Sequence, residues 1–178
     1  IETLAKGVFI EGNSSEQFIA LFDHPDPDVR EAAALAFARC WAANMGMAEP
    51  RAEGAELTRR REFMENFWAS ADKPTILKAL LEVISASVET GGSEFNDGDY
   101  QVLYLLSGFP GQETQRAETI AWVANHHPSD DMRRAAVFFL VNRDFPRDIG
   151  DEVLASRAHD PSRQVRFEAF IQRMQRIF

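Results

Sequence analysis

Three short segments of the chain align without gaps, and this repetition constrains the possible folds more than any other feature of the sequence. The segments begin at His24, His127 and Asp160. Each carries Pro at its second position, an apolar residue at its sixth, Arg at its seventh and Ala at its tenth. A fainter copy has Tyr100 at the apolar position, and the apolar positions of the last three copies are 32 and 33 residues apart. A period of this length holds one helical hairpin, so the chain is expected to be a stack of hairpins.

The residue pattern between these segments is helical almost throughout. Runs of β-branched residues are missing, Ala is frequent, and Pro and Gly fall between the periodic stretches, where helices end or begin. The predicted fold class is therefore all-α. Helices are expected at Ser14–Phe22, Asp28–Asn44, Gly54–Trp68, Pro74–Glu89, Asp99–Ser107, Glu113–Asn125, Asp130–Asn142, Ile149–Ala158 and Arg163–Ile177.

The repeated pattern Asp-Pro-x-x-x-Val-Arg-x-x-Ala resembles the start of the second helix of a HEAT repeat, including the bacterial HEAT-like repeats. The resemblance implies an α-α superhelix, a HEAT-like (armadillo-type) solenoid of about four to five hairpins in a single domain over residues 1–178. In that family the acid at the first position pairs with the Arg of an adjacent repeat. Asp160 matches the acid, and Arg30, Arg133 and Arg166 match the arginine. Because His24 and His127 occupy the acid position elsewhere, the series of Arg–Asp pairs is expected to be incomplete.

The last predicted helix, Arg163–Ile177, carries its large apolar residues on one stripe. These residues are Phe167, Phe170, Ile171, Met174 and, just beyond the helix, Phe178. Its arginines Arg166, Arg173 and Arg176 lie outside that stripe. We expect the stripe to face the stack and the arginines to face water, as the terminal helix of a repeat array requires.

The chain is acidic, and this property bears on its partners. The net charge is −9 and the calculated pI about 4.9, which argues against nucleic acid as a ligand, because nonspecific affinity for phosphates comes from Lys and Arg. Between Glu89 and Asp131 eight acidic residues stand against one base, Arg116. The region Gly46–Thr90, which contains no copy of the repeat, and the acidic stretch that borders it are the predicted location of any function beyond the stacking of the hairpins.

A protein or peptide held in a groove of the stack is the leading functional hypothesis, and the acidic balance favours a basic partner. Tyr and Trp often concentrate binding energy at such surfaces. The predicted binding residues are Glu94, Asp97, Asp99, Tyr100 and Tyr104. The alternative is a HEAT-like enzyme of the lyase type with a site in the groove, an activity that only the family resemblance implies.

Residues that could support catalysis or bind a metal form no recognisable motif. His24, His127 and His159 lie in separate predicted turns, and Cys40 belongs to an apolar helix, so no metal site is expected. The loop from Glu94 to Asp99 lacks the alternating oxygen ligands of a calcium loop. Phosphate-binding glycine loops, nucleophile elbows and zinc-protease helices are missing as well. Neither a cofactor nor a catalytic residue is predicted, and the enzyme question is left open.

The remaining features concern location. Apolar runs long enough to span a bilayer are missing, and Ile1–Ile10 does not have the pattern of a signal peptide. A single cysteine suits a reducing compartment, so a cytoplasmic location is expected. The chain does not begin with Met, and a third interpretation makes it a fragment of a larger scaffold. The oligomeric state stays open.

Overall fold

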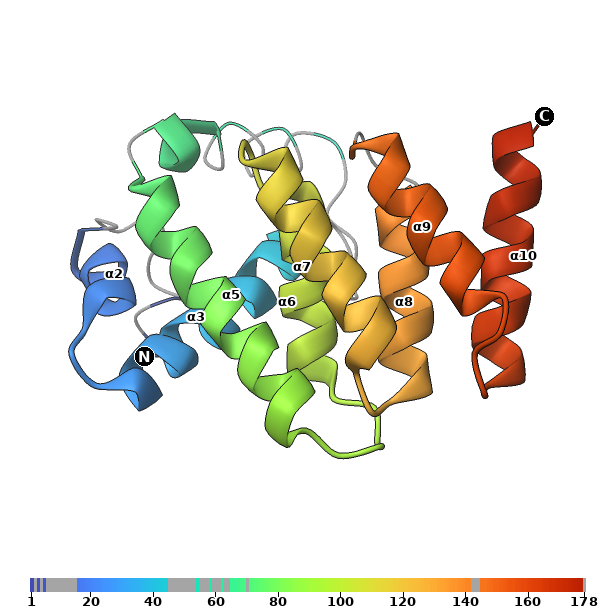
Figure 1. The fold of residues 1–178 in the computed structure, drawn as a ribbon. Coiled ribbons are helices and arrows are strands. Elements are labelled where there is room, and N and C mark those ends of the chain that lie inside the picture. The colour runs from blue at the N-terminus through green and yellow to red at the C-terminus, as the bar shows by residue number, and fades with distance from the viewer. Residues whose placement is uncertain are drawn as a thin grey trace. The chain divides into compact units, whose positions relative to one another are not determined.

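The computed structural model describes residues 1, 3, 5, 16–44, 54, 58, 62, 65–69, 71–141 and 145–177. Within these ranges the chain forms helices joined by loops and contains no strand, which confirms the all-α fold class (Figure 1). The chain divides into two compact units, Ile1–Val83 and Ile84–Phe178, and each is described by itself. The prediction of one domain over residues 1–178 stays a prediction.

The first unit has an aromatic core. It contains α2 (Glu16–Ile19), the 3-10 helix η1 (Ala20–Asp23), α3 (Pro27–Asn44) and the first part of α5 (Lys73–Thr90). Phe18, Phe22 and Phe37 are buried, with ring centroids 5.4–6.5 Å apart. Edge-to-face contacts of this kind add to the area that the rings bury. The predicted helix Gly54–Trp68 and the basic run Arg59–Arg61 lie largely or wholly outside the described residues.

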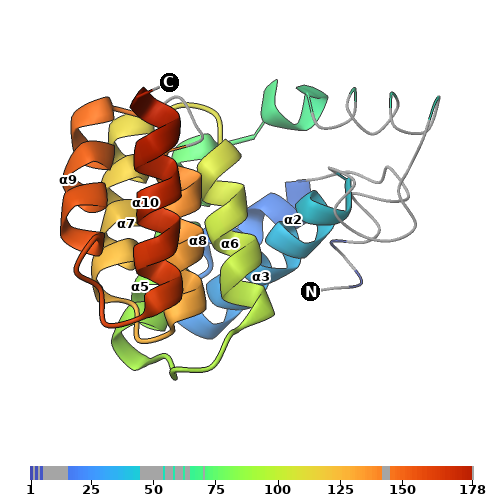
Figure 2. The same cartoon turned by 90° about the vertical axis from the view of Figure 1, so that its right-hand side faces the viewer.

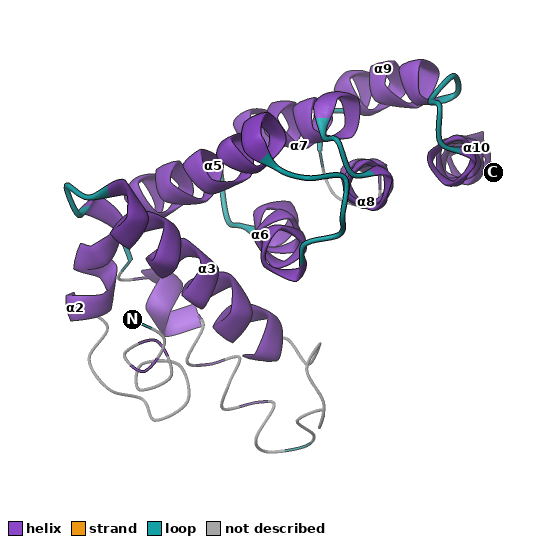
Figure 3. Ribbon diagram, turned by 90° about the horizontal axis from the view of Figure 1, so that it is seen from below, coloured by secondary structure: helices purple, strands orange, loops and turns teal. Residues whose placement is uncertain are grey.

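The second unit consists of helical hairpins arranged in two rows. It contains the end of α5, α6 (Asp97–Gly108), α7 (Glu113–His126), α8 (Asp130–Val141), α9 (Arg147–Arg157) and α10 (Arg163–Ile177). Seen from below, α7 and α9 form one row and α6, α8 and α10 form the other (Figure 3). Helix α8 packs against both α7 and α10, so successive hairpins bury their apolar faces on one another.

The register of the repeats follows the sequence pattern. Tyr100, Met132 and Val165 lie near the starts of α6, α8 and α10, which are the helices of one row. Met132 and Val165 are fully buried. The alanines that follow them, Ala136 and Ala169, are buried too, and their small side chains let the neighbouring helix approach closely. The expected placement of the repeated motif at the start of a second helix is therefore confirmed in the second unit.

The turn between α6 and α7 is closed by one buried arginine. Arg116 donates from Nη1 to the carbonyls of Leu106 and Ser107, at 2.9 and 3.3 Å, and from Nε to the carbonyl of Gly111, at 2.7 Å. Two of these acceptors belong to the last turn of α6, whose carbonyls have no partner within the helix. Arg116, the single base of the acidic stretch, therefore serves the fold. Burial lowers the pKa of its guanidinium, while nearby Glu113 opposes that shift.

The expectation that the apolar stripe of the last helix faces the stack is wrong for Phe167, Phe170 and Met174, whereas Ile171 is half-buried and Phe178 lies outside the described residues. Phe167 is 62% exposed, Phe170 59% and Ile177 67%, whereas Val165, Ala169 and Gln172 face the rest of the unit. Small and flexible side chains on this buried face permit close contact with α8 and α9, with which α10 packs. The aromatic stripe lies on the opposite side of the helix and faces outward. Figure 2 views the protein with α10 nearest the viewer.

Candidate functional site

A groove of about 390 Å³ opens on the row formed by α6, α8 and α10. Its walls come from the loop before α6, from α6 itself, from one side of α8 and from a single residue of α10. The residues that line it are Phe95, Tyr100, Asp131, Arg134, Ala135, Phe138, Phe139 and Glu168. All of them belong to the second unit, so the groove is built within one compact body.

The floor of the groove is aromatic. The ring of Tyr100 lies between Phe95 and Phe139, with centroid distances of 5.6 and 5.8 Å. Phe95 is 48% exposed and Phe138 45%, so both rings offer apolar area to a ligand. Burial raises the pKa of the Tyr100 phenol, and the neighbouring Tyr104 raises it further. The hydroxyl therefore keeps its proton at neutral pH and can donate a hydrogen bond.

The rim of the groove is charged and mainly acidic. Asp131 pairs with Arg134 at 3.3 Å, and the Glu168 carboxylate accepts a hydrogen bond of 2.7 Å from Gln172. A second, more open hollow of about 620 Å³ adjoins the groove, since both are lined by Phe95, and this hollow also contains Glu94 and Asp97. An aromatic floor beside several carboxylates suits an apolar side chain that is flanked by basic ones.

The predicted binding residues fall into different environments. Tyr100 lines the groove, and Glu94 and Asp97 line the adjoining hollow. Tyr104 packs on Phe139, with a centroid distance of 5.6 Å, behind the groove floor. Asp99 is buried and lines neither hollow.

Sequence reasoning missed the two most exposed rings of the groove, Phe95 and Phe138. Phe95 stands beside Glu94 in the acidic loop and could have been found there. Phe138 lies in a continuous apolar run, where the sequence carries no sign that one ring faces outward.

Asp99 joins a second polar group beneath the surface, together with Ser87 and His127. Ser87 Oγ donates to Asp99 Oδ2 at 2.5 Å and lies 3.0 Å from Nε2 of His127. The backbone N–H of Ser129 donates to Nδ1 of His127 at 3.0 Å. Because Nδ1 is an acceptor, the proton of the neutral ring must sit on Nε2, which therefore donates to Ser87.

This arrangement differs from that of a hydrolytic triad in the order of its members. A catalytic histidine lies between the serine and the carboxylate and accepts the serine proton through an unprotonated nitrogen. Here the serine lies in the middle, and neither ring nitrogen of His127 can take its proton. Burial lowers the pKa of His127 despite the nearby Asp99, which keeps the ring neutral. The group therefore acts as a clamp that joins the end of α5, the start of α6 and the α7–α8 turn.

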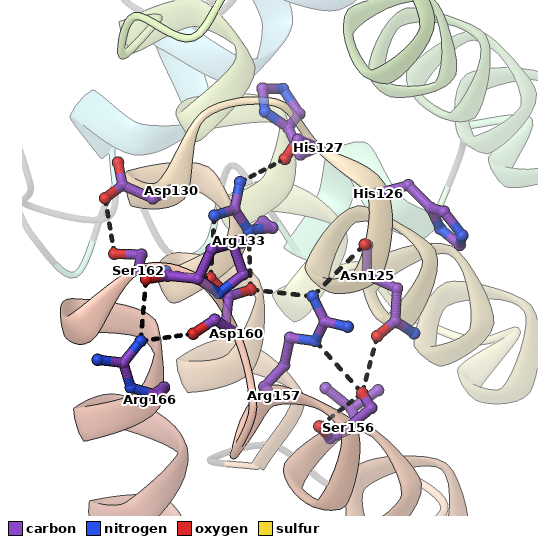
Figure 4. Close-up of polar contacts among 12 residues, drawn as sticks. Asn125, His126, His127, Asp130, Arg133, Ser156, Arg157, Asp160, Ser162 and Arg166 are labelled. Atoms are coloured by element: carbon purple, nitrogen blue, oxygen red, sulfur yellow. Dashed lines mark hydrogen bonds and ion pairs between the residues drawn. The ribbon is translucent and has the colours of Figure 1, made fainter.

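A third polar cluster surrounds Asp160, whose side chain is 0% exposed (Figure 4). Arg133 binds its carboxylate with two parallel hydrogen bonds of 3.0 Å, and Arg157 adds one of 2.9 Å. Burial alone would raise the pKa of Asp160, but the hydrogen bonds and charges of these arginines outweigh it and hold the pKa below its usual value. The predicted Arg–Asp pair between repeats is thus confirmed for Arg133 and Asp160. Arg30 instead pairs with Glu82, at 2.9 Å.

The turns of the three aligned segments share one hydrogen-bond pattern. In each, Nη1 of the Arg at the seventh position donates to the carbonyls of the first two residues; the arginines are Arg30, Arg133 and Arg166. The side chain of the first residue accepts the N–H two positions later. Asp160 accepts through Oδ1, and His24 and His127 accept through Nδ1. Histidine therefore reproduces the turn-forming contact of the aspartate.

The described residues show neither a metal site nor a membrane-spanning helix. They contain no group of three or more His, Cys, Asp or Glu side chains placed to hold a metal ion. None of the helices within those ranges is long and apolar enough to cross a membrane. Comparison with known proteins found no matching family model, no matching curated protein and no matching solved structure.

Proposed function

We propose that this protein is a non-catalytic interaction module, a HEAT-like stack of hairpins that holds a peptide or protein segment in the groove between α6 and α8. The observation that carries the proposal is the groove itself, with Phe95 and Phe138 about half exposed over a floor formed by Tyr100 and Phe139. The repeated motif and the stacked hairpins support the HEAT-like assignment. An enzyme of the lyase type stays an expectation from the family resemblance.

The partner that fits best is a segment with one large apolar side chain and neighbouring Lys or Arg. Fully burying an exposed Phe side chain is worth about 1.5–3 kcal/mol, so covering the exposed half of Phe95 or Phe138 is worth about half of that. A partner ring inserted beside Tyr100 would bury several such surfaces at once. The carboxylates of Asp131, Glu168 and the adjoining hollow favour positive charge at the edges. Such rim charges govern the association rate and its salt dependence more than the final affinity.

Selection from a displayed library of random peptides tests the proposal. Wild-type protein and the variant Phe138→Ser are used in parallel, with Phe167→Ser as the matched control, because Phe167 is an exposed Phe that does not line the groove. Circular dichroism first verifies that the three proteins are equally folded. Enriched peptides are then synthesised, and their affinities are measured by isothermal titration calorimetry.

We expect enriched peptides to combine an aromatic or leucine residue with flanking Lys or Arg. Phe138→Ser should weaken binding at least about tenfold, which corresponds to the loss of roughly 1.4 kcal/mol. Phe167→Ser should leave the affinity unchanged. The groove would be refuted as the binding site if no motif that combines an aromatic or leucine residue with Lys or Arg were enriched, or if such a motif bound Phe138→Ser as tightly as wild type.

A further inference from the structure

The outer face of α10 has the character of a second, separate binding surface. It consists of Phe167, Phe170, Met174 and Ile177, with Arg166 at its edge. All four apolar residues are exposed, and they recur at the three- and four-residue spacing that places side chains on one side of a helix. This face lies opposite Val165, Ala169 and Gln172, by which α10 packs into the second unit.

The repeat register shows what covers the same face one hairpin earlier. Phe170 and Met174 follow Val137 and Val141 by 33 residues, which is the repeat period. On α8 the ring of Phe139 contacts α6. Consecutive helical residues are about 100° apart, so Val137 and Phe139 point to opposite flanks of α8.

Val137 is fully buried, and α8 packs against α10. The flank of α8 that is covered by the following hairpin therefore corresponds to the flank of α10 that is exposed.

The arginines of the two turns show the same difference. Arg133 and Arg166 each donate Nη1 to the first two carbonyls of their turn, which fixes the direction of the guanidinium group. In Arg133 the remaining edge, Nε and Nη2, binds both oxygens of Asp160 on the following hairpin. Among the described residues no carboxylate pairs with Arg166. Its guanidinium is held in the same way and presents an equivalent edge outward (Figure 4).

We propose that the outer face of α10 binds an acidic amphipathic helix of a partner polypeptide, with an Asp in the turn before that helix seated on Arg166. In this contact α10 and Arg166 would take the place of α8 and Arg133, and the partner's helix and Asp would take the place of α10 and Asp160. The positive charge of α10 favours an acidic partner. The helix carries four arginines, of which Arg176 is paired with Asp151, and one glutamate, so two copies of this face would repel each other. The site is separate from the groove and does not depend on the function proposed for it.

An anionic membrane is the competing ligand, because basic helices with an aromatic face also bind lipid headgroups. One observation favours a protein helix. The Arg166 guanidinium is oriented for a two-oxygen carboxylate contact at one defined place.

The test uses a defined probe peptide of the same length as Asp160–Ile177. The probe keeps the opening Asp-Pro-Ser, and it keeps Val and Ala at the positions of Val165 and Ala169. It has Leu at the position of Gln172 and Glu in place of each of the four arginines. A hydrocarbon staple keeps it helical, because short isolated helices are marginal in water. Its binding to the full chain is measured by fluorescence anisotropy, and phosphatidylserine vesicles are tested separately by co-sedimentation.

We expect the probe to bind wild-type protein, and Arg166→Met to weaken binding about tenfold, since that change removes charge-assisted hydrogen bonds. A probe with Asn in place of its first Asp should bind wild-type protein with an affinity lowered by a similar factor. Combining this probe with Arg166→Met should lower the affinity little further than either change alone. Phe170→Asp should abolish binding, whereas the groove variant Phe138→Ser should bind normally. Circular dichroism checks that each variant is folded.

Three results would overturn the proposal. The first is absence of binding to wild type, and the second is binding that Arg166→Met and Phe170→Asp both leave unchanged. The third is binding of phosphatidylserine vesicles that Phe170→Asp abolishes, which would assign the face to a membrane. If only Phe138→Ser lost the probe, the groove would be its site; the proposal for α10 would fail while the proposed function stood.

Discussion

Asp160→Asn tests how much the buried carboxylate of Asp160 contributes to stability. The Oδ1 atom of Asp160 accepts from the N–H of Ser162 and from Nη2 of Arg133, and Oδ2 accepts from Nε of Arg133 and from Arg157. Asparagine keeps the first oxygen and replaces the second by an NH2 group. The two charge-assisted hydrogen bonds to Oδ2 are lost. The NH2 group of asparagine would instead face the N–H groups of Arg133 and Arg157, at a position where the Asp160 side chain is 0% exposed.

The magnitude follows from these contacts. Removing one partner of a buried ion pair costs about 3–5 kcal/mol, and the contacts that asparagine retains place the expected loss at the lower end, about 3 kcal/mol. Asp131→Asn is the matched control, since Asp131 pairs with Arg134 at 3.3 Å while about half of each side chain is exposed. An exposed pair of this kind contributes less than about 1 kcal/mol.

Urea unfolding followed by far-UV circular dichroism measures both losses, and its pH dependence adds a second check. The pKa of Asp160 is lowered in the folded protein, so its contribution is complete above the unfolded value of about 3.9 and is lost as the pH falls through the folded value. The difference between wild type and Asp160→Asn should therefore narrow below about pH 4. A loss no larger than that of Asp131→Asn, or a difference that stays constant down to pH 2, would contradict this account of the cluster.

Three further predictions concern single residues of the second unit. Burial lowers the pKa of His127, so the free energy of unfolding should fall as the pH drops below about 6.5, and His127→Asn should remove that slope in urea titrations. Arg116→Met should cost about 2 kcal/mol or more in the same assay, because three carbonyls lose their donor, and Arg116→Lys should cost less. Gln112 has a φ of 54°, and Gln112→Asn should raise the melting temperature slightly, with a gain of up to about 1 kcal/mol, since Asn tolerates this conformation better. A fall in melting temperature would contradict that explanation.

Much of the helical architecture could be predicted because its boundaries are marked in the sequence. The turns before α8 and α10 contain Pro128 and Pro161, and α6 ends at Gly108. Proline cannot continue a preceding helix and glycine weakens one, so most predicted bounds agree with the structure within a few residues. The repeat register could be predicted for the same reason, because the motif contains both the turn and the first buried residue of the next helix.

The groove could be predicted only in part, because exposure within an apolar helix is decided by packing. In α8 eight of the ten residues from Met132 to Val141 are apolar, and no period distinguishes Phe138 from its buried neighbours. Tyr100 and the acidic loop were found from their composition, but composition does not show that Asp99 turns inward to Ser87.

The error at α10 has a similar origin. Hydrophobicity favours burying Phe167 and Phe170, yet the repeat pattern places Val165 and Ala169 against the preceding hairpin, and in the structure the register prevails.

The histidines at the first position of two segments show how a repeat can change its chemistry and keep its turn. Both His24 and His127 accept the N–H two residues later through Nδ1, as Asp160 does through Oδ1, so the backbone of the turn is preserved. The contact made by the other polar atom of the side chain, Oδ2 of aspartate or Nε2 of histidine, differs between the two residues. A carboxylate can bind the arginine of the preceding repeat, whereas the Nε2–H of a neutral imidazole is a donor and needs an acceptor. For His127 that acceptor is Ser87, which in turn donates to Asp99. The residue that stands where the preceding arginine would be is Gln101, whose Oε1 is buried with no hydrogen-bond partner among the described residues. At His127 a neutral, pH-sensitive clamp therefore replaces the ion pair between repeats, and this exchange accounts for the interruption of the series of Arg–Asp pairs at this position.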